Sequence, residues 1–173
     1  PWPGLDALFA PGREILLALR FELDLYINFR PVHCLDDAFC PLKGKTARDI
    51  QFTVFRENTE GLYVHVGGIL KKGTPDEVAI NEDINTRKGV ERIIRYAFQR
   101  ALERDRQRRE SGEASRPPKV TLVDKANAIR AHDLWTRVFS EVGEAEFPNV
   151  ERDHAYVDAC CMWMVKNPEW FDV

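Results

Sequence analysis

The sequence is poor in the residues that crosslink a chain, and it lacks long apolar runs. Its four cysteines, Cys34, Cys40, Cys160 and Cys161, show no CxxC spacing, which argues against a disulfide framework or a thiolate metal site. We interpret them as free thiols of a reducing compartment and expect a cytoplasmic protein. No apolar run reaches the roughly 18 residues of a membrane span, and we find no secretory signal pattern. A membrane partner is therefore not expected.

The chain also lacks excess positive charge and a glycine-rich nucleotide fingerprint. Its net charge is -3 and its pI is about 5.9, which oppose general nucleic-acid binding. Residues 100–109 do carry five arginines against two acids. A basic nucleic-acid-binding helix is a distant alternative there, and we favour the solvated end of a helix. No GxGxxG motif follows a predicted strand, so the sequence does not identify a nucleotide-binding fold by itself.

A length of 173 residues with 44% hydrophobic content suits one compact α/β unit. Apolar residues spaced three and four apart predict a helix over about 86–107, and alternating apolar runs predict strands. Proline and glycine at 11–12 are expected to interrupt regular structure before a short helix. The expected fold is a mixed sheet flanked by helices, with a protruding β-hairpin arm. The other expected helices are 14–21, 134–142 and 157–166, and the expected strands are 23–32, 50–55, 62–69, 77–84, 119–123 and 150–155.

Two segments predict a homodimer. The helix 157–166 is apolar on nearly every face, so its own domain and a second subunit are both needed to cover it. The hairpin arm at about 62–84 needs a surface to lie against, because an isolated hairpin is marginally stable in water. Both requirements are met if two copies of the chain associate.

The polar stretch from Arg56 to Tyr63 follows the predicted strand 50–55 and is the main candidate site. A guanidinium, a glycine at a bend and a phenol suit the binding of an anion with proton transfer beside it. The alternative is an ordinary strand, polar turn and strand. Leu16 and Leu17 likewise suit either a ligand contact or the core. For Asp158 the alternative role is stabilisation of a helix N-terminus.

Four blocks resemble the β-decarboxylating dehydrogenases of 2-hydroxy acids, which include isopropylmalate, isocitrate, D-malate and tartrate dehydrogenases. The chain is most similar to the isopropylmalate branch, with the tartrate and D-malate branches next. In order along the chain, the blocks are Leu16–Arg20 leading to Asp24–Pro31, then Arg56–Tyr63, Val123–Asn127, and Tyr156–Ala159 running to Phe171–Val173.

The resemblance implies a role for each matched residue. Three arginines would clamp the substrate carboxylates, two leucines would contact an apolar substituent, and a lysine and a tyrosine would serve as general base and general acid. It implies NAD and Mg²⁺ or Mn²⁺ as cofactors, with the lysine and the metal ligand acting in the partner subunit's active site. The matched residues are Arg20, Arg30 and Arg56 for the clamp, Leu16 and Leu17, Lys125 as base, Tyr63 as acid, Asn127 toward the nicotinamide and Asp158 on the metal. Glu14 lies one residue out of register with a further family acid.

The resemblance also predicts how the chain is organised. Family members are about twice as long, so residues 1–24 are expected to be a remnant of the large, nucleotide-side domain and residues 25–173 the small, dimer-forming domain. The expected function is that of a fragment of a 3-isopropylmalate dehydrogenase of leucine biosynthesis, inactive alone with both cofactors unbound. The alternative is a non-catalytic dimerisation module. Phe171–Val173 is expected to open a further strand.

Overall fold

The computed structural model describes residues 5–113 and 116–173, and the chain forms an α/β fold. Helices and strands alternate in the second half, whereas a helix and four strands make up the first half. Short 3-10 helices span 37–39, 47–49, 130–132 and 168–170. The helices are α1 Leu5–Glu22, α2 Arg87–Ser111, α3 Asp133–Glu146 and α4 Val157–Lys166, and the strands are β1 Ile27–His33, β2 Gln51–Glu57, β3 Gly67–Leu70, β4 Val78–Asn81, β5 Lys119–Asp124 and β6 Glu151–Tyr156.

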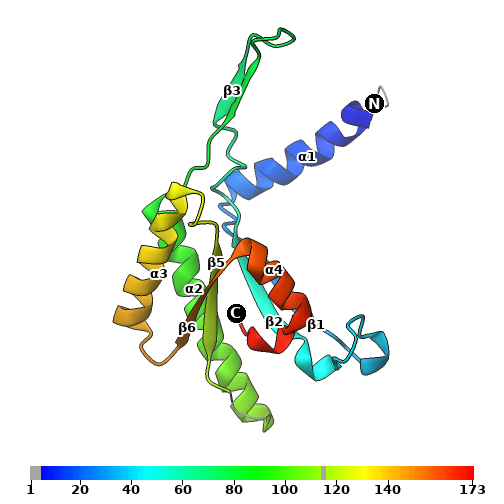
Figure 1. The fold of residues 1–173 in the computed structure, drawn as a ribbon, viewed down its shortest axis with the longest axis vertical. Helices are drawn as coiled ribbons and strands as arrows, with labels where there is room; N and C mark the ends of the chain where they lie inside the picture. The colour runs from blue at the N-terminus through cyan, green and yellow to red at the C-terminus, as the bar shows by residue number, and fades with distance from the viewer. Residues whose placement is uncertain (1–4, 114–115) are drawn as a thin grey trace.

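Within the described residues the strands pair two by two: β1 with β2 and β3 with β4 antiparallel, and β5 with β6 parallel. The segment after α4 joins the first pair to the last. The Thr53 amide donates to the Asp172 carbonyl at 2.9 Å, and the Thr121 amide donates to the Val173 carbonyl at 2.8 Å. The C-terminus accordingly lies between β2 and β5 (Figure 1). Residues 171–173 form no assigned strand, but they link the antiparallel and parallel parts.

The main core lies where α2 and α3 pack beside β5. Phe98 is fully buried and stacks on Phe139 at 5.2 Å and on Phe147 at 5.0 Å between ring centroids. The apolar stripe of α2 faces this cluster. This stripe holds α2 against the sheet, although most residues of the helix are polar. Thr86 caps α2 by accepting a hydrogen bond from the Gly89 amide at 3.0 Å. The predicted helix 86–107 is thereby confirmed and extends to Ser111.

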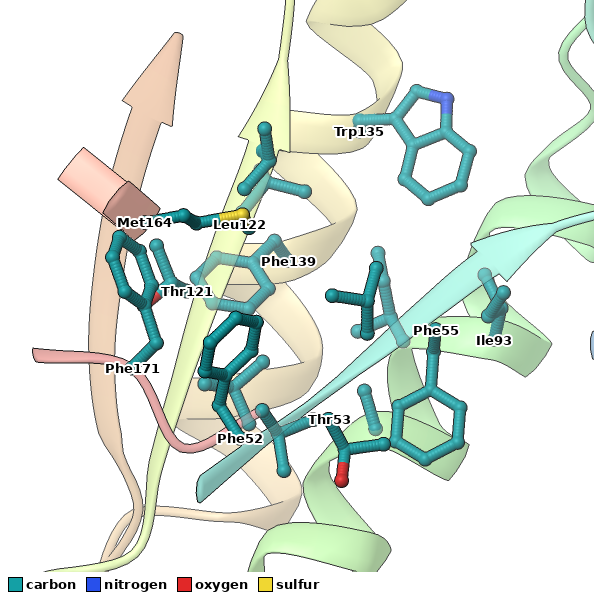
Figure 2. Close-up of a pocket in the computed structure, with 16 residues that line it drawn as sticks. Phe52, Thr53, Phe55, Ile93, Thr121, Leu122, Trp135, Phe139, Met164 and Phe171 are labelled. Carbon is teal, nitrogen blue, oxygen red and sulfur yellow. The ribbon is translucent and has the colours of Figure 1, made fainter. Parts of the chain in front are cut away.

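A smaller apolar cluster surrounds Phe171 and lines a cavity of about 120 Å³ between β2 and β5. Figure 2 shows Phe52 from β2, Phe171 and Met164 gathered beside Leu122 of β5. The Phe52 and Phe171 ring centroids are 6.0 Å apart. These side chains continue the core from the parallel pair of strands to the antiparallel pair.

The arginine-rich end of α2 is not simply solvated, which corrects one expectation. Arg108 donates to both carboxylate oxygens of the buried Asp172, at 2.8 and 3.1 Å, and Arg104 donates to one of them at 2.8 Å. Arg116 reaches the same carboxylate at 3.2 Å. Burial raises the pKa of Asp172, but the hydrogen bonds from Arg108 and Arg104 outweigh it and leave that pKa below its ordinary value.

Other boundaries differ from the sequence expectation. Helix α1 includes residues 11–12, which were expected to interrupt the chain, because leucine and alanine on both sides favour helix strongly enough to outweigh two local breakers. Strand β1 begins at Ile27, not at residue 23, because Asp24 adopts a left-handed conformation with φ 47° and turns the chain. Helix α4 has the predicted bounds, with Cys160 buried but Cys161 exposed. Burial raises the pKa of the Cys160 thiol to about 11.

Apolar side chains of the β3–β4 arm, of α1 and of α4 face solvent. The β3–β4 arm and α1 extend away from the body of the molecule (Figure 1), and Ile69, Leu70, Val78 and Ile80 of the arm are all exposed. The side of α4 that carries Met162 and Val165 is exposed as well. No helix in the described ranges has the length and apolar character that a bilayer crossing requires.

Candidate functional site

Two guanidiniums on the β1–β2 pair are linked through two asparagines. Asn28 of β1 lies opposite Arg56 of β2, and each arginine bonds to an asparagine. Arg30 donates from Nε to Asn28 Oδ1 at 2.8 Å, and Arg56 donates from one terminal nitrogen to Asn58 Oδ1 at 2.8 Å. Arg56 Nε is buried and has no hydrogen-bond partner among the described residues. A buried charged donor left free in this way indicates a place for an anionic acceptor.

The turn that follows Arg56 is held by several side-chain hydrogen bonds. Glu57 accepts the Thr59 amide at 2.9 Å and the Glu60 amide at 2.7 Å through one carboxylate oxygen. Glu60 in turn accepts the Thr86 amide at 2.8 Å at the start of α2. Arg92 of α2 donates to the Thr59 hydroxyl at 2.7 Å. The turn is therefore fixed to the N-terminal half of α2, which holds Arg56 in place.

Tyr63 lies directly beside Arg56. The Arg56 guanidinium carbon is 5.2 Å from the centroid of the Tyr63 ring, a cation–π contact. Gly61, with φ 79°, permits the bend between them and pairs with Ile84 at the base of the arm. The Tyr63 side chain is 55% exposed, so its hydroxyl can reach a ligand.

Lys125 and Asp158 form an ion pair at the C-terminal ends of the parallel strands. Lys125 follows β5 directly, and Asp158 lies in the first turn of α4, which follows β6. The hydrogen bond from Lys125 keeps the pKa of Asp158 below its ordinary value. Ligand-facing groups of α/β sheets gather at this edge because the strands all end there.

The Lys125 turn is anchored by its neighbour Asp124. This buried carboxylate accepts the Ala126 amide at 2.9 Å through Oδ1 and lies 3.0 Å from His154 Nε2 through Oδ2. Asp124 therefore fixes both the end of β5 and the first residues of the turn.

A cavity of about 250 Å³ lies between Arg56 and the end of β5, and neither Lys125 nor Asp158 is among its lining residues. Its walls include Arg56, Tyr63, Asp124, His132 and Trp135. The guanidinium, the phenol and the end of β5 therefore open on the same space.

The remaining sequence-predicted residues are placed less closely. Arg20 is half-buried near the end of α1, and its carbonyl accepts the Leu25 amide at 2.9 Å. Leu16 is exposed and Leu17 is half-buried on the same helix, so neither belongs to the core clusters of the described residues. Asn127 is exposed on the turn after Lys125. The side chain of Glu14 lies outside the described residues.

The residues described here contain no group of three His, Cys, Asp or Glu side chains that could hold a metal ion. Asp158 supplies a single exposed carboxylate. This fits a magnesium-type site only if the other oxygen ligands come from elsewhere, since Mg²⁺ commonly keeps waters and takes one or two carboxylates plus substrate oxygens.

Sequence reasoning did not find Asn28, Asp124 or His132 as parts of this site. Asn28 and Asp124 each had a signal in the sequence, because Asn28 stands two residues before Arg30 and Asp124 directly precedes Lys125. His132 carried only its position seven residues past Lys125, which is too general to identify a contact.

The sequence places the chain in a family of dehydrogenases. Residues 7–173 match the family model described as isocitrate/isopropylmalate dehydrogenase, and the chain belongs to that family. It is 46% identical over 162 residues to the 3-isopropylmalate dehydrogenase of Thermobifida fusca, covering 93% of this chain and 42% of the relative. The same enzyme of Frankia casuarinae is also 46% identical, with 93% of this chain and 43% of the relative covered. The chain thus spans less than half the length of these relatives.

Solved structures show the same family resemblance. The isocitrate dehydrogenase of Methylococcus capsulatus superposes with a TM-score of 0.70 at 35% identity, covering 91% of this chain and 42% of that one. The TT0538 protein of Thermus thermophilus gives a TM-score of 0.70 at 32% identity, covering 91% of this chain and 28% of that one. The α/β fold predicted from the sequence is confirmed as part of this family's fold.

Proposed function

We propose that this chain carries the substrate clamp and the proton-transfer residues of an NAD-dependent enzyme that oxidises and decarboxylates 3-isopropylmalate in leucine biosynthesis. The observation that carries the proposal is the pair of guanidiniums on β1 and β2. Within the part of the chain that the structure describes, Arg30 and Arg56 bond to amide oxygens and not to carboxylates, and Arg56 Nε is left without a partner. A dicarboxylate would complete both groups.

The clamp fixes the substrate relative to the acid and the base. Arg56 would bind one substrate carboxylate, with Arg30 beside it and Arg20 approaching from the end of α1. Tyr63, stacked against Arg56, would then lie next to the bound carboxylate. Holding the reacting carbon in one orientation supplies much of the rate enhancement in such reactions.

Lys125 would accept the hydroxyl proton of the substrate that is bound in the other copy of the chain, and Tyr63 would donate a proton to the carbon that loses CO₂. In the structure the Lys125 ammonium is paired with Asp158 and cannot act as a base in that state. If Asp158 bound a metal cation instead, it would release Lys125. The positive charge of that cation would then favour the neutral amine form of Lys125. When bound, Mg²⁺ or Mn²⁺ would polarise the hydroxyl oxygen of the substrate. NAD, held with Asn127 near its nicotinamide, would accept the hydride.

The same geometry suggests which 2-hydroxy acid is accepted. Leu16 is exposed on α1, so an apolar substituent such as isopropyl would find an apolar contact there and a third carboxylate would not. Tartrate and D-malate remain the alternative substrates. Competition of these acids with isopropylmalate would rank them.

A second candidate function is a dimerisation module without catalysis, favoured by the exposed apolar arm and α4 face. We propose a homodimer in either case, with residues 25–173 as the dimer-forming domain, residues 1–24 as the remnant of another domain, and the cytoplasm as the compartment.

Light scattering is expected to give a dimer mass at micromolar concentration. Ile69→Lys and Val165→Lys should shift the protein toward monomer, because each buries a charge in the shared surface. A stable monomer in the unmutated protein would refute the homodimer.

Substrate binding separates the two functions. Isothermal titration with 3-isopropylmalate should detect binding, and Arg56→Gln should weaken it by about ten- to hundredfold, as expected for losing a hydrogen bond between charged groups. Arg48→Gln is the matched control, since Arg48 is an exposed arginine just before the other end of β2. Equal affinities in the two variants, or no binding by the unmutated chain, would favour the dimerisation module.

A further inference from the structure

The backbone of Lys125 is held by a histidine. The Lys125 amide donates to Nδ1 of His132 at 2.9 Å, and the Ala128 and Ile129 amides close the same turn by donating to the Lys125 carbonyl at 2.9 and 2.8 Å. His132 is part of the short 3-10 helix that precedes α3. The turn that carries Lys125 is therefore packed against its own downstream segment.

This contact fixes the protonation of the imidazole. A backbone N–H can only donate, so Nδ1 of His132 must be the acceptor and the neutral ring carries its hydrogen on Nε2. Nε2 lies 3.1 Å from Asp83 Oδ2, to which it donates in this tautomer. The His132 side chain is 21% exposed and the Asp83 side chain 16% exposed, so both are shielded from water.

Asp83 belongs to the base of the arm. It follows β4 and precedes Ile84, whose amide and carbonyl pair with Gly61. Its other oxygen accepts from the Asn85 side chain at 2.9 Å, and Asn85 accepts from the Trp135 indole at 2.8 Å. These hydrogen bonds form one continuous chain from the base of the arm to the Lys125 amide.

We infer that His132 is a positioning residue for Lys125, and that it couples the base of the arm to the turn that carries this lysine. The geometry of the coupling does not depend on what the lysine does. The interpretation of Lys125 as the base that is positioned rests on the proposed function. A change in the arm base that moves Asp83 would reorient the His132 ring and release the Lys125 amide.

Two substitutions at position 132 separate the two ends of the coupling. His132→Asn keeps an acceptor close to the position of Nδ1 but loses the donor to Asp83. His132→Gln can still reach Asp83 but removes the Nδ1 acceptor. Hydrogen exchange measured by NMR on the 173-residue chain should show the Lys125 amide exchanging about three- to tenfold faster in His132→Gln, with a smaller increase in His132→Asn, which keeps the acceptor but loses the contact with Asp83.

The coupling itself is tested by Asp83→Ala, which does not touch Lys125. Exchange at Lys125 should accelerate in this variant, and the effects of Asp83→Ala and His132→Gln should be non-additive, because both act through the same hydrogen bond. Imidazole ¹⁵N shifts should show an unprotonated Nδ1 and a protonated Nε2 in the unmutated protein. His33→Asn, a change at an exposed histidine of β1, is the control for a general loss of structure.

Either of two results would overturn the inference. One is a ring with its hydrogen on Nδ1, and the other is Lys125 exchange that His132→Gln and Asp83→Ala leave unchanged while the fold is retained. These readouts need no substrate. If isopropylmalate fails to bind while the exchange results are as expected, the proposed function fails and the positioning of Lys125 stands.

Discussion

Asp172→Asn is expected to lower the free energy of unfolding by about 3–5 kcal/mol, the cost typical of breaking a buried ion pair. The carboxylate is 2% exposed and accepts hydrogen bonds from Arg104, Arg108 and Arg116. Asparagine has nearly the same shape but no charge, so the guanidiniums of Arg104, Arg108 and Arg116 would lose the charged group that they share. Urea denaturation measures the change. Asp133→Asn, which breaks an exposed i,i+4 pair with Arg137, should cost less than about 1 kcal/mol.

The same carboxylate predicts a pH dependence. Its pKa in the folded protein is below the ordinary value of 3.8, because the hydrogen bonds from Arg108 and Arg104 outweigh burial. A depressed folded pKa contributes stability that is complete above the unfolded pKa and is lost as pH falls through the folded one. The stability difference between the unmutated protein and Asp172→Asn should therefore shrink below about pH 3.8. A difference that stays constant down to pH 2 would assign the effect to packing.

The second large effect is an absence of turnover. We expect no formation of NADH from 3-isopropylmalate by this chain supplied with NAD and Mg²⁺. The family resemblance assigns one metal-binding carboxylate to these residues, Asp158, and the described residues contain no cluster of three metal-ligating side chains, so the cation would be weakly held. Asn127 is the one cofactor contact that the family resemblance places in these residues, which leaves the hydride acceptor poorly positioned.

A full-length relative is the positive control for that assay. The 3-isopropylmalate dehydrogenase of Thermobifida fusca, of which this chain matches 42%, should generate NADH under the same conditions. Robust activity of the 173-residue chain that Lys125→Met abolishes would show that the site is complete here. Activity unaffected by Lys125→Met would point to a contaminating enzyme.

Local pattern predicted most of the helices and strands. The α4 bounds 157–166 follow from an apolar run, and α2 follows from a stripe with a threonine cap. The end of α2 was placed four residues early, because Arg108 is held by Asp172, 64 residues away. No spacing rule relates such distant partners. The turn at Asp24 was missed for a different reason, since a left-handed aspartate has no distinctive pattern.

Most of the candidate site residues could be predicted from the sequence, but their contacts with each other could be seen only in the structure. Arg56 and Tyr63 lie in one stretch, so their contact follows from local geometry. The pairing of Lys125 with Asp158 depends on β5 and β6 being parallel neighbours, which the sequence does not state. The roles assigned to Arg20, Asn127 and the other matched residues stay predictions until binding and activity are measured.

The backbone link through residues 171–173 also bears on the speed of folding. It joins β5 to β2, and the nearby ion pair of Lys45 with Glu169 closes a loop of 124 residues. Closing such a loop costs entropy before any contact compensates for it, so chains rich in distant contacts fold slowly. We expect α2 to acquire helix early and the junction between the two strand pairs to form late. Stopped-flow refolding should then show Trp163, which packs beside Trp170 at 5.1 Å, reaching its native fluorescence after most of the helical signal has returned.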